Sequence, residues 1–258
     1  MMEADADDHE VRIRFFTPTV EVPSCGHATI AAHYVRARRL GLPRCRIWQA
    51  IKAGRLPVDV DLRNGDYFIV MTQATPQVSD PDRGELRDAV VEALGLGPDQ
   101  IVPDLPIQRI DTGNSKVLIP VCSSSVLNKM TPNLSALVDI HRRVPNGGYF
   151  VFTLLNPDSG ILAHSRMFAP NIGIAEDPVT GNGHGPRGVY LVITVSWEAQ
   201  AVIFISRAGR ERQWVEQGQS RCGSRYATHA TRHTNRREGR RCLRNATERS
   251  KWFLKFPT

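Results

Sequence analysis

Residues 165–191, S-R-M-F-A-P-N-I-G-I-A-E-D-P-V-T-G-N-G-H-G-P-R-G-V-Y-L, predict the central feature of the fold. They read as an apolar strand, a turn with adjacent carboxylates at Glu176 and Asp177, and a glycine-rich elbow that enters a helix. The amides of a helix's first turn have no partner within the helix and carry a partial positive charge. A carboxylate ligand beside an acidic side chain is therefore the expected occupant of this turn.

The same pattern occurs once earlier in the chain. R-F-F-T-P at residues 14–18 and R-M-F-A-P at residues 166–170 both fit R-x-F-x-P, and each leads through a proline to a glycine elbow. The first elbow is C-G-H-A-T at residues 25–29, and the second elbow is T-G-N-G-H-G at residues 180–185. A repeat at this spacing predicts two similar half-molecules. Two facing elbows would enclose one ligand between two helix N-termini.

These segments resemble the PhzF family of phenazine-biosynthesis-like isomerases, which are similar in fold to diaminopimelate epimerase. The resemblance rests on F-T-P-T-V-E-V-P-S-C-G-H-A-T-I-A-A-H from residue 16 and M-F-A-P-N-I-G-I-A-E-D-P-V-T-G-N-G-H-G-P from residue 167. It implies an α/β (α+β) fold of two pseudo-symmetric half-domains, each a mixed sheet curled around a central helix. The expected halves are residues 1–105 and 106–206, followed by a basic tail at 207–258.

The resemblance also implies a function. The implied activity is that of a cofactor-independent isomerase, which would move a proton on a small carboxylate-bearing metabolite as a double-bond or hydrogen shift. Asp177 would help to position and shuttle protons, and His27, with an ordinary pKa of about 6.5, would suit a proton relay. Three ordinary roles stay open: Asp177 as a helix N-cap, His27 as a surface imidazole and Asn182 as a turn residue. The expected substrate-binding residues are Gly26, Gly181, Asn182 and Gly183.

Other polar residues near the elbows are assigned structural roles. Cys25 resembles, by position, the catalytic thiol of diaminopimelate epimerase, but that chemistry needs a second cysteine where Thr180 stands. Racemisation by two thiols is therefore not expected, and Cys25 is predicted to be a small buried residue. His33 and His184 are predicted to be structural. Arg187 interrupts an apolar helix start and suits neither role.

The two ends of the chain depart from the family pattern. The resemblance implies an opening strand and helix with a catalytic Glu in a segment like S-E-T-A-F, and neither Glu3 nor Glu10 is expected to replace it. Residues 207–258 show no apolar period, which predicts a basic, disordered tail and looks like translation in a shifted frame. The alternative function is therefore an inactive truncated or frame-shifted remnant whose tail binds nucleic acid nonspecifically.

The net charge of +7 comes from this tail. Residues 193–258 contain 14 Lys and Arg against 5 Asp and Glu, whereas the preceding residues are slightly acidic. Fourteen cations would bind phosphate through counterion release, but no aromatic interleaving indicates sequence-specific binding. The candidate ligands of a metal site in the tail would be Cys222, His229, His233 and Cys242. Their cysteines lack the paired spacing of zinc modules, and the sequence shows no cofactor motif.

Composition sets the general class. A chain of 258 residues with 41% hydrophobic and 23% charged residues is typical of a globular protein. No apolar run approaches the roughly 20 residues of a membrane helix, and the acidic N-terminus does not resemble a signal peptide. Five scattered cysteines without C-x-x-C favour a reducing compartment. We therefore expect a cytoplasmic protein and, from the resemblance, a homodimer.

Apolar periodicity predicts the secondary structure. Asn64-Gly65 predicts a tight hairpin turn between two alternating segments. Helices are expected at residues 26–40, 85–94 and 134–144, and strands at 11–16, 45–49, 56–62, 67–72, 116–121, 148–155 and 161–168.

Overall fold

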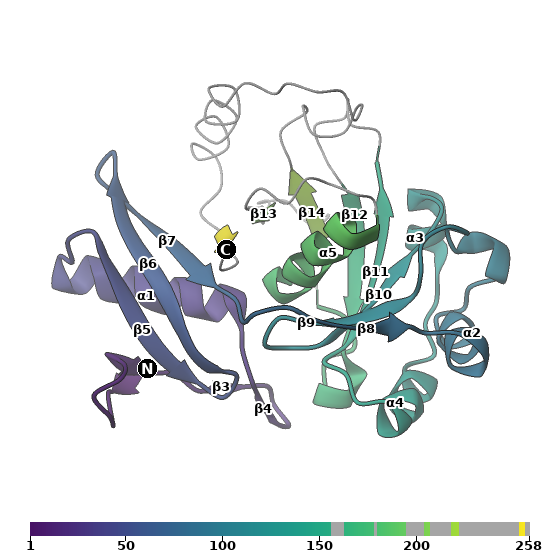
Figure 1. Ribbon diagram of the computed structural model, residues 1–258, viewed down its shortest axis with the longest axis horizontal. Coiled ribbons are helices and arrows are strands. Elements are labelled where there is room, and N and C mark those ends of the chain that lie inside the picture. Colours follow the sequence, from purple (N-terminus) through teal and green to yellow (C-terminus); the bar gives the residue numbers. More distant parts are fainter. Residues whose placement is uncertain (156–162, 178–179, 195–203, 207–217, 222–252, 256–258) are drawn as a thin grey trace.

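The chain forms two halves that lie side by side, each with a helix against a sheet (Figure 1). The first half packs α1 (Gly26–Leu40) against β5 (Cys45–Ile51), β6 (Gly54–Arg63) and β7 (Asp66–Thr72). These three strands are consecutive and antiparallel. The computed structural model describes residues 1–155, 163–177, 180–194, 204–206, 218–221 and 253–255.

Helix α1 has the bounds predicted from the sequence. Its buried residues include Ile30, His33 and Ala37, which recur at helical spacing. Gly41 adopts a left-handed conformation with φ 59° and ends the helix. His33 Nε2 donates to Gln49 Oε1 at 3.1 Å, and both residues are fully buried, which confirms the predicted structural role of His33.

The predicted hairpin turn is also confirmed. Asn64 and Gly65 have φ values of 50° and 77°, the left-handed conformations that a tight hairpin turn requires. Strands β6 and β7 pair on either side of it, with Arg63 opposite Asp66.

The predicted strand at 11–16 is divided into two short strands. Strand β2 (Val11–Arg12) runs parallel to β5, whereas β3 (Phe15–Phe16) pairs with β4 (Glu21–Val22) in a separate two-stranded sheet. Arg14 lies at the break and forms an ion pair with Glu21 across this small hairpin. The two parts of the predicted strand therefore pair with different partners, which local alternation does not indicate.

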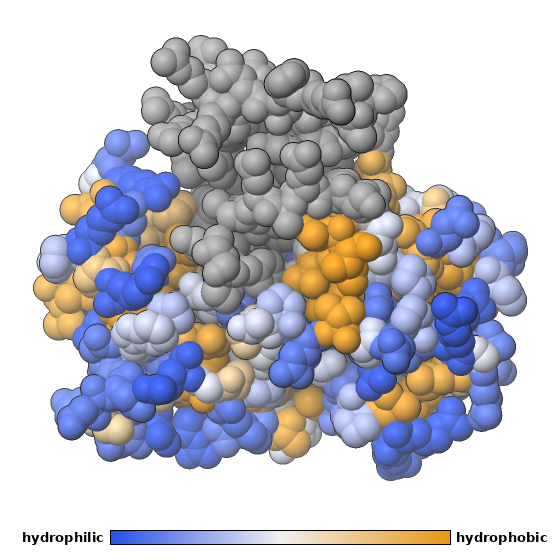
Figure 2. All heavy atoms as spheres, in the orientation of Figure 1, coloured by the Kyte–Doolittle hydropathy of each residue, from blue (hydrophilic) through white to orange (hydrophobic). Residues whose placement is uncertain are grey.

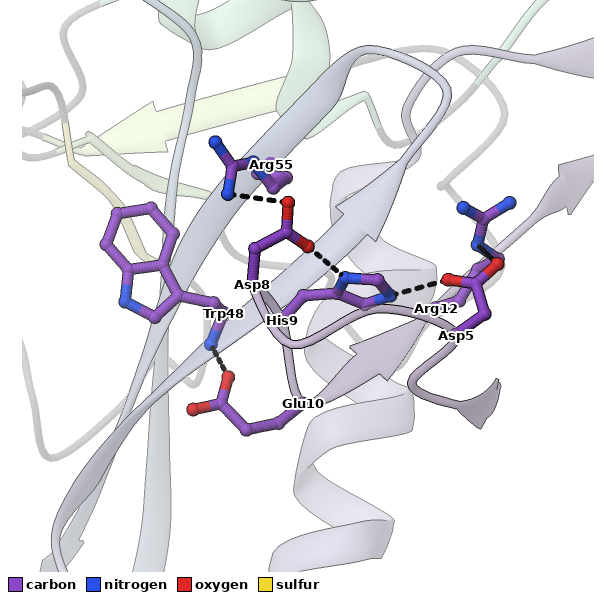
Figure 3. A network of polar contacts seen from close by, with 7 residues as sticks. All are labelled: Asp5, Asp8, His9, Glu10, Arg12, Trp48 and Arg55. Atoms are coloured by element: carbon purple, nitrogen blue, oxygen red, sulfur yellow. Dashed lines mark hydrogen bonds and ion pairs between the residues drawn. The ribbon is translucent and has the colours of Figure 1, made fainter.

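A polar network holds the N-terminal segment onto the first half (Figure 3). His9 is buried between two carboxylates, with Nδ1 2.6 Å from Asp8 and Nε2 2.9 Å from Asp5. Asp8 also pairs with Arg55 at 2.7 Å, and Asp5 pairs with Arg12 at 2.9 Å. The Asp5–Arg12 pair thus joins the segment to the nearby β2, and the Asp8–Arg55 pair joins it to the distant β6.

Glu10 takes part in the same network. Its Oε2 accepts a hydrogen bond of 2.6 Å from the backbone amide of Trp48 in β5. Glu10 therefore helps to hold the N-terminal segment on the sheet. Strand β1 (Met2–Glu3) pairs with β2, and its two residues are exposed.

The second half contains a mixed sheet covered on both faces. Its core strands are β10 (Lys116–Pro120), parallel to β11 (Tyr149–Leu154), and β12 (Ala163–Phe168), antiparallel to β11. Leu118, Phe150 and Phe152 pack with residues of α5 (Gly181–Thr194). Alternate residues along the same strands pack with the outer helices α2 (Gly84–Ala93), α3 (Ser124–Lys129) and α4 (Leu134–Arg143).

Two elements within residues 1–105 pack on the second half. Strand β8 (Gln77–Pro81) pairs with β9 (Gln108–Asp111), and β9 pairs with β10. Helix α2 shares a buried core with α4, in which Val90 contacts the same cluster as Leu137. The division at residue 105 stays a prediction, and these contacts show that β8 and α2 lie with the second half.

Three short strands lie between the two halves of the sheet. Strand β15 (Phe253–Lys255) runs parallel to β7, and β14 (Gly218–Arg221) is antiparallel to β12. Strand β13 (Phe204–Ser206) lies between β14 and β15 and pairs with each of them. Strands β14 and β15 differ from the irregular tail expected at 207–258. Without β15 and β14 the edges of β7 and β12 would leave backbone groups unpaired, and such edges favour added strands. Most of the tail residues that were expected to bind nucleic acid lie outside the part of the chain that the structure describes.

The surface is mixed rather than uniformly apolar. Figure 2 shows hydrophilic side chains over much of both halves, with hydrophobic groups between them. Among the residues that the structure describes, none of the helices combines the length and the apolar character needed to cross a membrane.

Candidate active site

The two elbows meet across 158 residues of sequence. Asn182 Nδ2, in the first turn of α5, donates to the Ser24 carbonyl oxygen at 3.0 Å and to Ser24 Oγ at 3.4 Å. A Cβ on Gly26 would lie 3.2 Å from Asn182 Oδ1, so the glycine permits this close approach. The N-termini of α1 and α5 therefore lie next to each other, as the repeated elbows predict.

A second contact joins the two halves nearby. Thr19, in the turn between β3 and β4, donates from Oγ1 to the Ile172 carbonyl oxygen at 3.0 Å. Gly173 has φ 79°, and a Cβ there would lie 2.7 Å from Thr19 Oγ1. The short helix η3 (Pro170–Ile172) therefore receives the hairpin tip of the first half and helps to fix the relative position of the elbows.

His27 is the ionisable group at the start of α1. Its Nε2 lies 3.6 Å from Cys25 Sγ, and hydrogen bonding to this thiol raises the pKa of His27. Burial opposes this shift, and the nearby charge of Asp177 adds to it. Cys25 is half-buried and contacts His27, whereas a small buried residue was predicted. The imidazole is thus electrostatically linked to both its own elbow and Asp177.

Asp177 is held by its backbone and Glu176 by its side chain. The Asp177 amide donates to the Met167 carbonyl oxygen at 2.8 Å. Both Glu176 oxygens accept from Arg166, each at 2.8 Å. Of the two acids in E-D-P, Glu176 is therefore committed to an ion pair, and Asp177 is the carboxylate that interacts with His27.

The glycines of the second elbow differ in their surroundings. Gly181 lies beside the first elbow, because a Cβ on Gly26 would be 3.9 Å from Gly181 Cα. Gly183 instead faces the core, where a Cβ would overlap the ring of Phe150. Its amide donates to the Thr180 carbonyl oxygen at 3.2 Å. The close packing of Gly183 therefore has a structural cause that is independent of any ligand.

His184 and Arg187 lie within α5, and their side chains are buried in the protein. The His184 ring stacks edge-on against Phe150 at 5.5 Å between centroids, and burial lowers the pKa of His184 well below its ordinary value. Arg187 is fully buried, with Cζ 6.0 Å from the centre of the Phe150 ring. Both residues thus pack on one aromatic side chain, and His184 is neutral, consistent with its predicted structural role.

Lys116 is a buried cation that the sequence reasoning did not single out. Its Nζ donates to Asn114 Oδ1 at 2.7 Å and to the Gly147 and Ser115 carbonyl oxygens at 3.0 and 3.2 Å. Burial lowers the pKa of Lys116 to about 7, although the charges of Asp111 and Asp177 oppose the shift. Its position at the start of the apolar strand K-V-L-I-P was the available signal.

The turn before Lys116 reaches the first elbow. Ser24 Oγ donates to the Gly113 carbonyl oxygen at 3.4 Å, while the Gly113 amide donates to Asp111 Oδ1 at 2.6 Å. Ser24 therefore connects this turn to Asn182. Serine at this position had not been predicted as part of the site, because its contacts depend on the folded chain.

The structure brings together most of the predicted site residues. Gly26, Gly181 and Asn182 adjoin, and His27 and Asp177 interact electrostatically, whereas Gly183 faces Phe150. The amides at the start of two helices can bind an anion, and an imidazole with a carboxylate can hold or transfer a proton. No three His, Cys, Asp or Glu side chains gather as metal ligands in the described part of the chain. The four tail residues considered as metal ligands lie outside it.

The sequence matches a known protein family over most of its length. The model of the PhzC-PhzF family, described as phenazine biosynthesis-like protein, matches residues 1–215. An uncharacterized isomerase, YddE, from Escherichia coli strain K12 is 50% identical over 190 residues, which cover 72% of this chain and 62% of the relative. An uncharacterized isomerase from Clostridium acetobutylicum is 47% identical over 184 residues, covering 71% and 61%. The chain thus spans about 62% of the length of these curated relatives.

Solved structures show the same fold. A PhzF-family phenazine biosynthesis protein from Bacillus anthracis matches with a TM-score of 0.68 and 28% identity, covering 83% of this chain and 72% of that chain. A hydroxyproline epimerase from Agrobacterium vitis matches with a TM-score of 0.56 and 12% identity, covering 85% and 70%. The second match concerns the fold alone, and it confirms the predicted epimerase-like α+β architecture.

Proposed function

The chain belongs to the phenazine biosynthesis-like PhzC-PhzF family, and we propose that it is an isomerase acting on a small carboxylate-bearing metabolite. The observation that carries the proposal is the hydrogen bond from Asn182 to Ser24, which places two helix N-termini at one site. Helix N-termini stabilise anions through their free amides and their dipoles. Relatives that carry the name isomerase support the reaction class.

Substrate binding follows from the two elbows. The carboxylate of the substrate would accept hydrogen bonds from the backbone amides around Gly26 and Gly181. When a conjugated acid loses a proton from carbon, negative charge spreads onto its carboxylate oxygens. Donors already aimed at those oxygens stabilise this charge more than they stabilise the substrate, which lowers the barrier. Asn182 would keep the two sets of donors together.

Proton transfer would use Asp177 and His27. One proton leaves one carbon of the substrate and another is added at a second carbon, so the reaction is a shift of a double bond without net oxidation. The raised pKa of His27 keeps a larger fraction of the imidazole protonated near neutral pH. His27 would therefore orient or donate a proton, while the Asp177 carboxylate accepts one.

The experiment is an NMR assay in deuterium oxide without added cofactor. The panel would contain small conjugated acids, such as cyclohexadiene carboxylates and methyl-substituted butenedioates. The proposal predicts a shifted double bond and deuterium at carbon in at least one panel member. Folded protein that binds these acids yet leaves every carbon-bound proton in place would overturn it.

A further inference from the structure

The segment before each elbow contains an ion pair between an arginine and a glutamate, Arg14 with Glu21 and Arg166 with Glu176. We propose that the Arg166–Glu176 ion pair, called the second clamp because it lies before the second elbow, holds the Asp177 carboxylate in position for proton transfer. This role rests on the proposed function, but the geometry that supports it can be tested without catalysis. Arg166 acts through Asp177 and is a positioning residue.

The second clamp fixes the guanidinium of Arg166 on several sides. Nε and one terminal nitrogen donate to the two Glu176 oxygens, each at 2.8 Å, which is a bidentate ion pair. The other terminal nitrogen donates to the Leu127 and Met130 carbonyl oxygens at 3.1 and 3.0 Å, at the end of α3. Cζ lies 5.0 Å from the ring centre of Phe168. Bidentate, charge-assisted bonds of this kind specify geometry as well as adding stability.

Two consecutive residues of β12 hold the loop that carries Asp177. The side chain of Arg166 binds Glu176, and the carbonyl oxygen of Met167 accepts from the Asp177 amide at 2.8 Å. A shift of the Asp177 backbone would therefore stretch one of these bonds. A displacement of about 1 Å at a reacting group can lower a rate about 100-fold. The clamp is thus placed where small errors have large effects.

A related pair in the first half supports a role specific to the elbows. Arg14 donates from Nε and a terminal nitrogen to Glu21, each at 2.9 Å, and its Cζ lies 4.8 Å from the ring centre of Phe16. In both halves the arginine thus pairs with a glutamate before the elbow and stacks on the aromatic residue two positions later. This first clamp is more open, since the Arg14 side chain is 53% exposed against 16% for Arg166. The repeated R-x-F-x-P motif therefore forms the same contact twice.

The first test measures backbone amide exchange by NMR in Arg166→Met and Glu176→Gln. Loss of the charged pair should raise the exchange rate of the Asp177 amide at least about tenfold, because a hydrogen bond to a charged group is among the stronger ones. Arg46→Met is the matched control, since Arg46 makes a bidentate pair with Asp59 at 2.7 and 3.1 Å on β5 and β6. It should leave the Asp177 amide unchanged.

The second test measures turnover of whichever acid the wild type isomerises. Arg166→Met should lower kcat and leave KM almost unchanged, and Arg166→Met with Asp177→Asn should be no slower than Asp177→Asn alone. Arg166→Lys should recover only part of kcat, because an ammonium cannot make the bidentate contact. If Arg166→Met lowers kcat in the Asp177→Asn background by the same factor as in the wild type, the positioning role is overturned.

The two proposals fail in different ways. If the wild type isomerises no acid but amide exchange at Asp177 depends on Arg166, the isomerase proposal fails and the clamp's geometry stands. If a folded Arg166→Met or Glu176→Gln protein keeps wild-type exchange at Asp177, the clamp proposal is overturned whatever the activity. Glu176→Gln keeps side-chain length, so it gives a decision even where Arg166→Met does not fold.

Discussion

Asn182 donates a side-chain hydrogen bond to the carbonyl oxygen of Ser24, and this contact joins the start of α5 to the residue just before the first elbow. It joins the two halves of the protein at the place where both helix N-termini lie. Here the charge of Asp177 raises the pKa of His27. The Ser24 hydroxyl also donates to the Gly113 carbonyl oxygen in a third segment. The candidate site is therefore an assembly of three segments.

Asn182→Ala should weaken substrate binding more than it weakens the fold. The change removes one good neutral hydrogen bond and one long one, so the free energy of unfolding should fall by about 1 kcal/mol in urea titrations. Asn133→Ala is the matched control, because its side chain accepts from the Ala136 amide at 3.1 Å at the start of α4, within the second half. Both variants should lose similar stability, but only Asn182→Ala should raise KM. Equal effects on KM would show that the elbow contact has no functional role.

Cys25→Ala should lower the pKa of His27 towards its ordinary value. The thiol is the largest cause of the raised pKa, so the imidazole would lose its proton at a lower pH. Because the folded pKa is raised, the stability that this group contributes is present at low pH and is lost as pH rises through the folded pKa. NMR titration of the His27 ring protons measures the shift. Cys45→Ala, on β5, should leave the titration unaltered, and a His27 titration that does not respond to Cys25→Ala would contradict the assignment.

Gly183→Ala should destabilise the protein more than Gly26→Ala. A methyl group at Gly183 would overlap the buried ring of Phe150, and such overpacking costs about 1–3 kcal/mol. At Gly26 the added carbon would meet only the Asn182 amide oxygen at 3.2 Å, which can shift slightly. Thermal melting of the two variants gives the order. A less stable Gly26→Ala variant would contradict the packing described for the second elbow.

Lys116→Met should change the dependence of stability on pH. Burial lowers the pKa of Lys116 to about 7, whereas an unfolded lysine has a pKa of about 10.4. From about pH 7 to about pH 9 the unfolded chain binds a proton that the folded chain releases, so the free energy of unfolding rises with pH. Urea midpoints across this range should rise in the wild type and rise less in the variant. Parallel curves would contradict the lowered pKa of Lys116 in the folded protein.

The elements found by sequence reasoning are those with strong local signals. The helix at Gly26–Leu40 has a regular apolar period and a glycine at its end, and the hairpin at Asn64 has a turn that only a few residue types favour. Strand β8 reads Q-V-S-D-P and has no such signal, because its pairing with β9 decides its conformation. Likewise, the break at Arg14 accompanies a change of partner strand, from β5 for β2 to β4 for β3.

The site shows the same division. The repeated elbows predicted that two helix N-termini would face each other, because each elbow begins a helix and the two halves are alike. The cage around Lys116 includes a carbonyl oxygen 31 residues away, and the partner of Glu176 lies on the preceding strand. Contacts of this kind arise from the way the strands are ordered in space, which local patterns do not contain.

The most direct test of the central claim is deuterium incorporation into a conjugated acid by the wild type and by Asp177→Asn, followed by NMR. Asp139→Asn is the control, because Asp139 is an exposed carboxylate on α4 that pairs with Arg142. The account predicts that Asp177→Asn slows incorporation by at least about 100-fold, the usual contribution of a general acid or base, while the control keeps the wild-type rate. Incorporation at the wild-type rate in Asp177→Asn would contradict it.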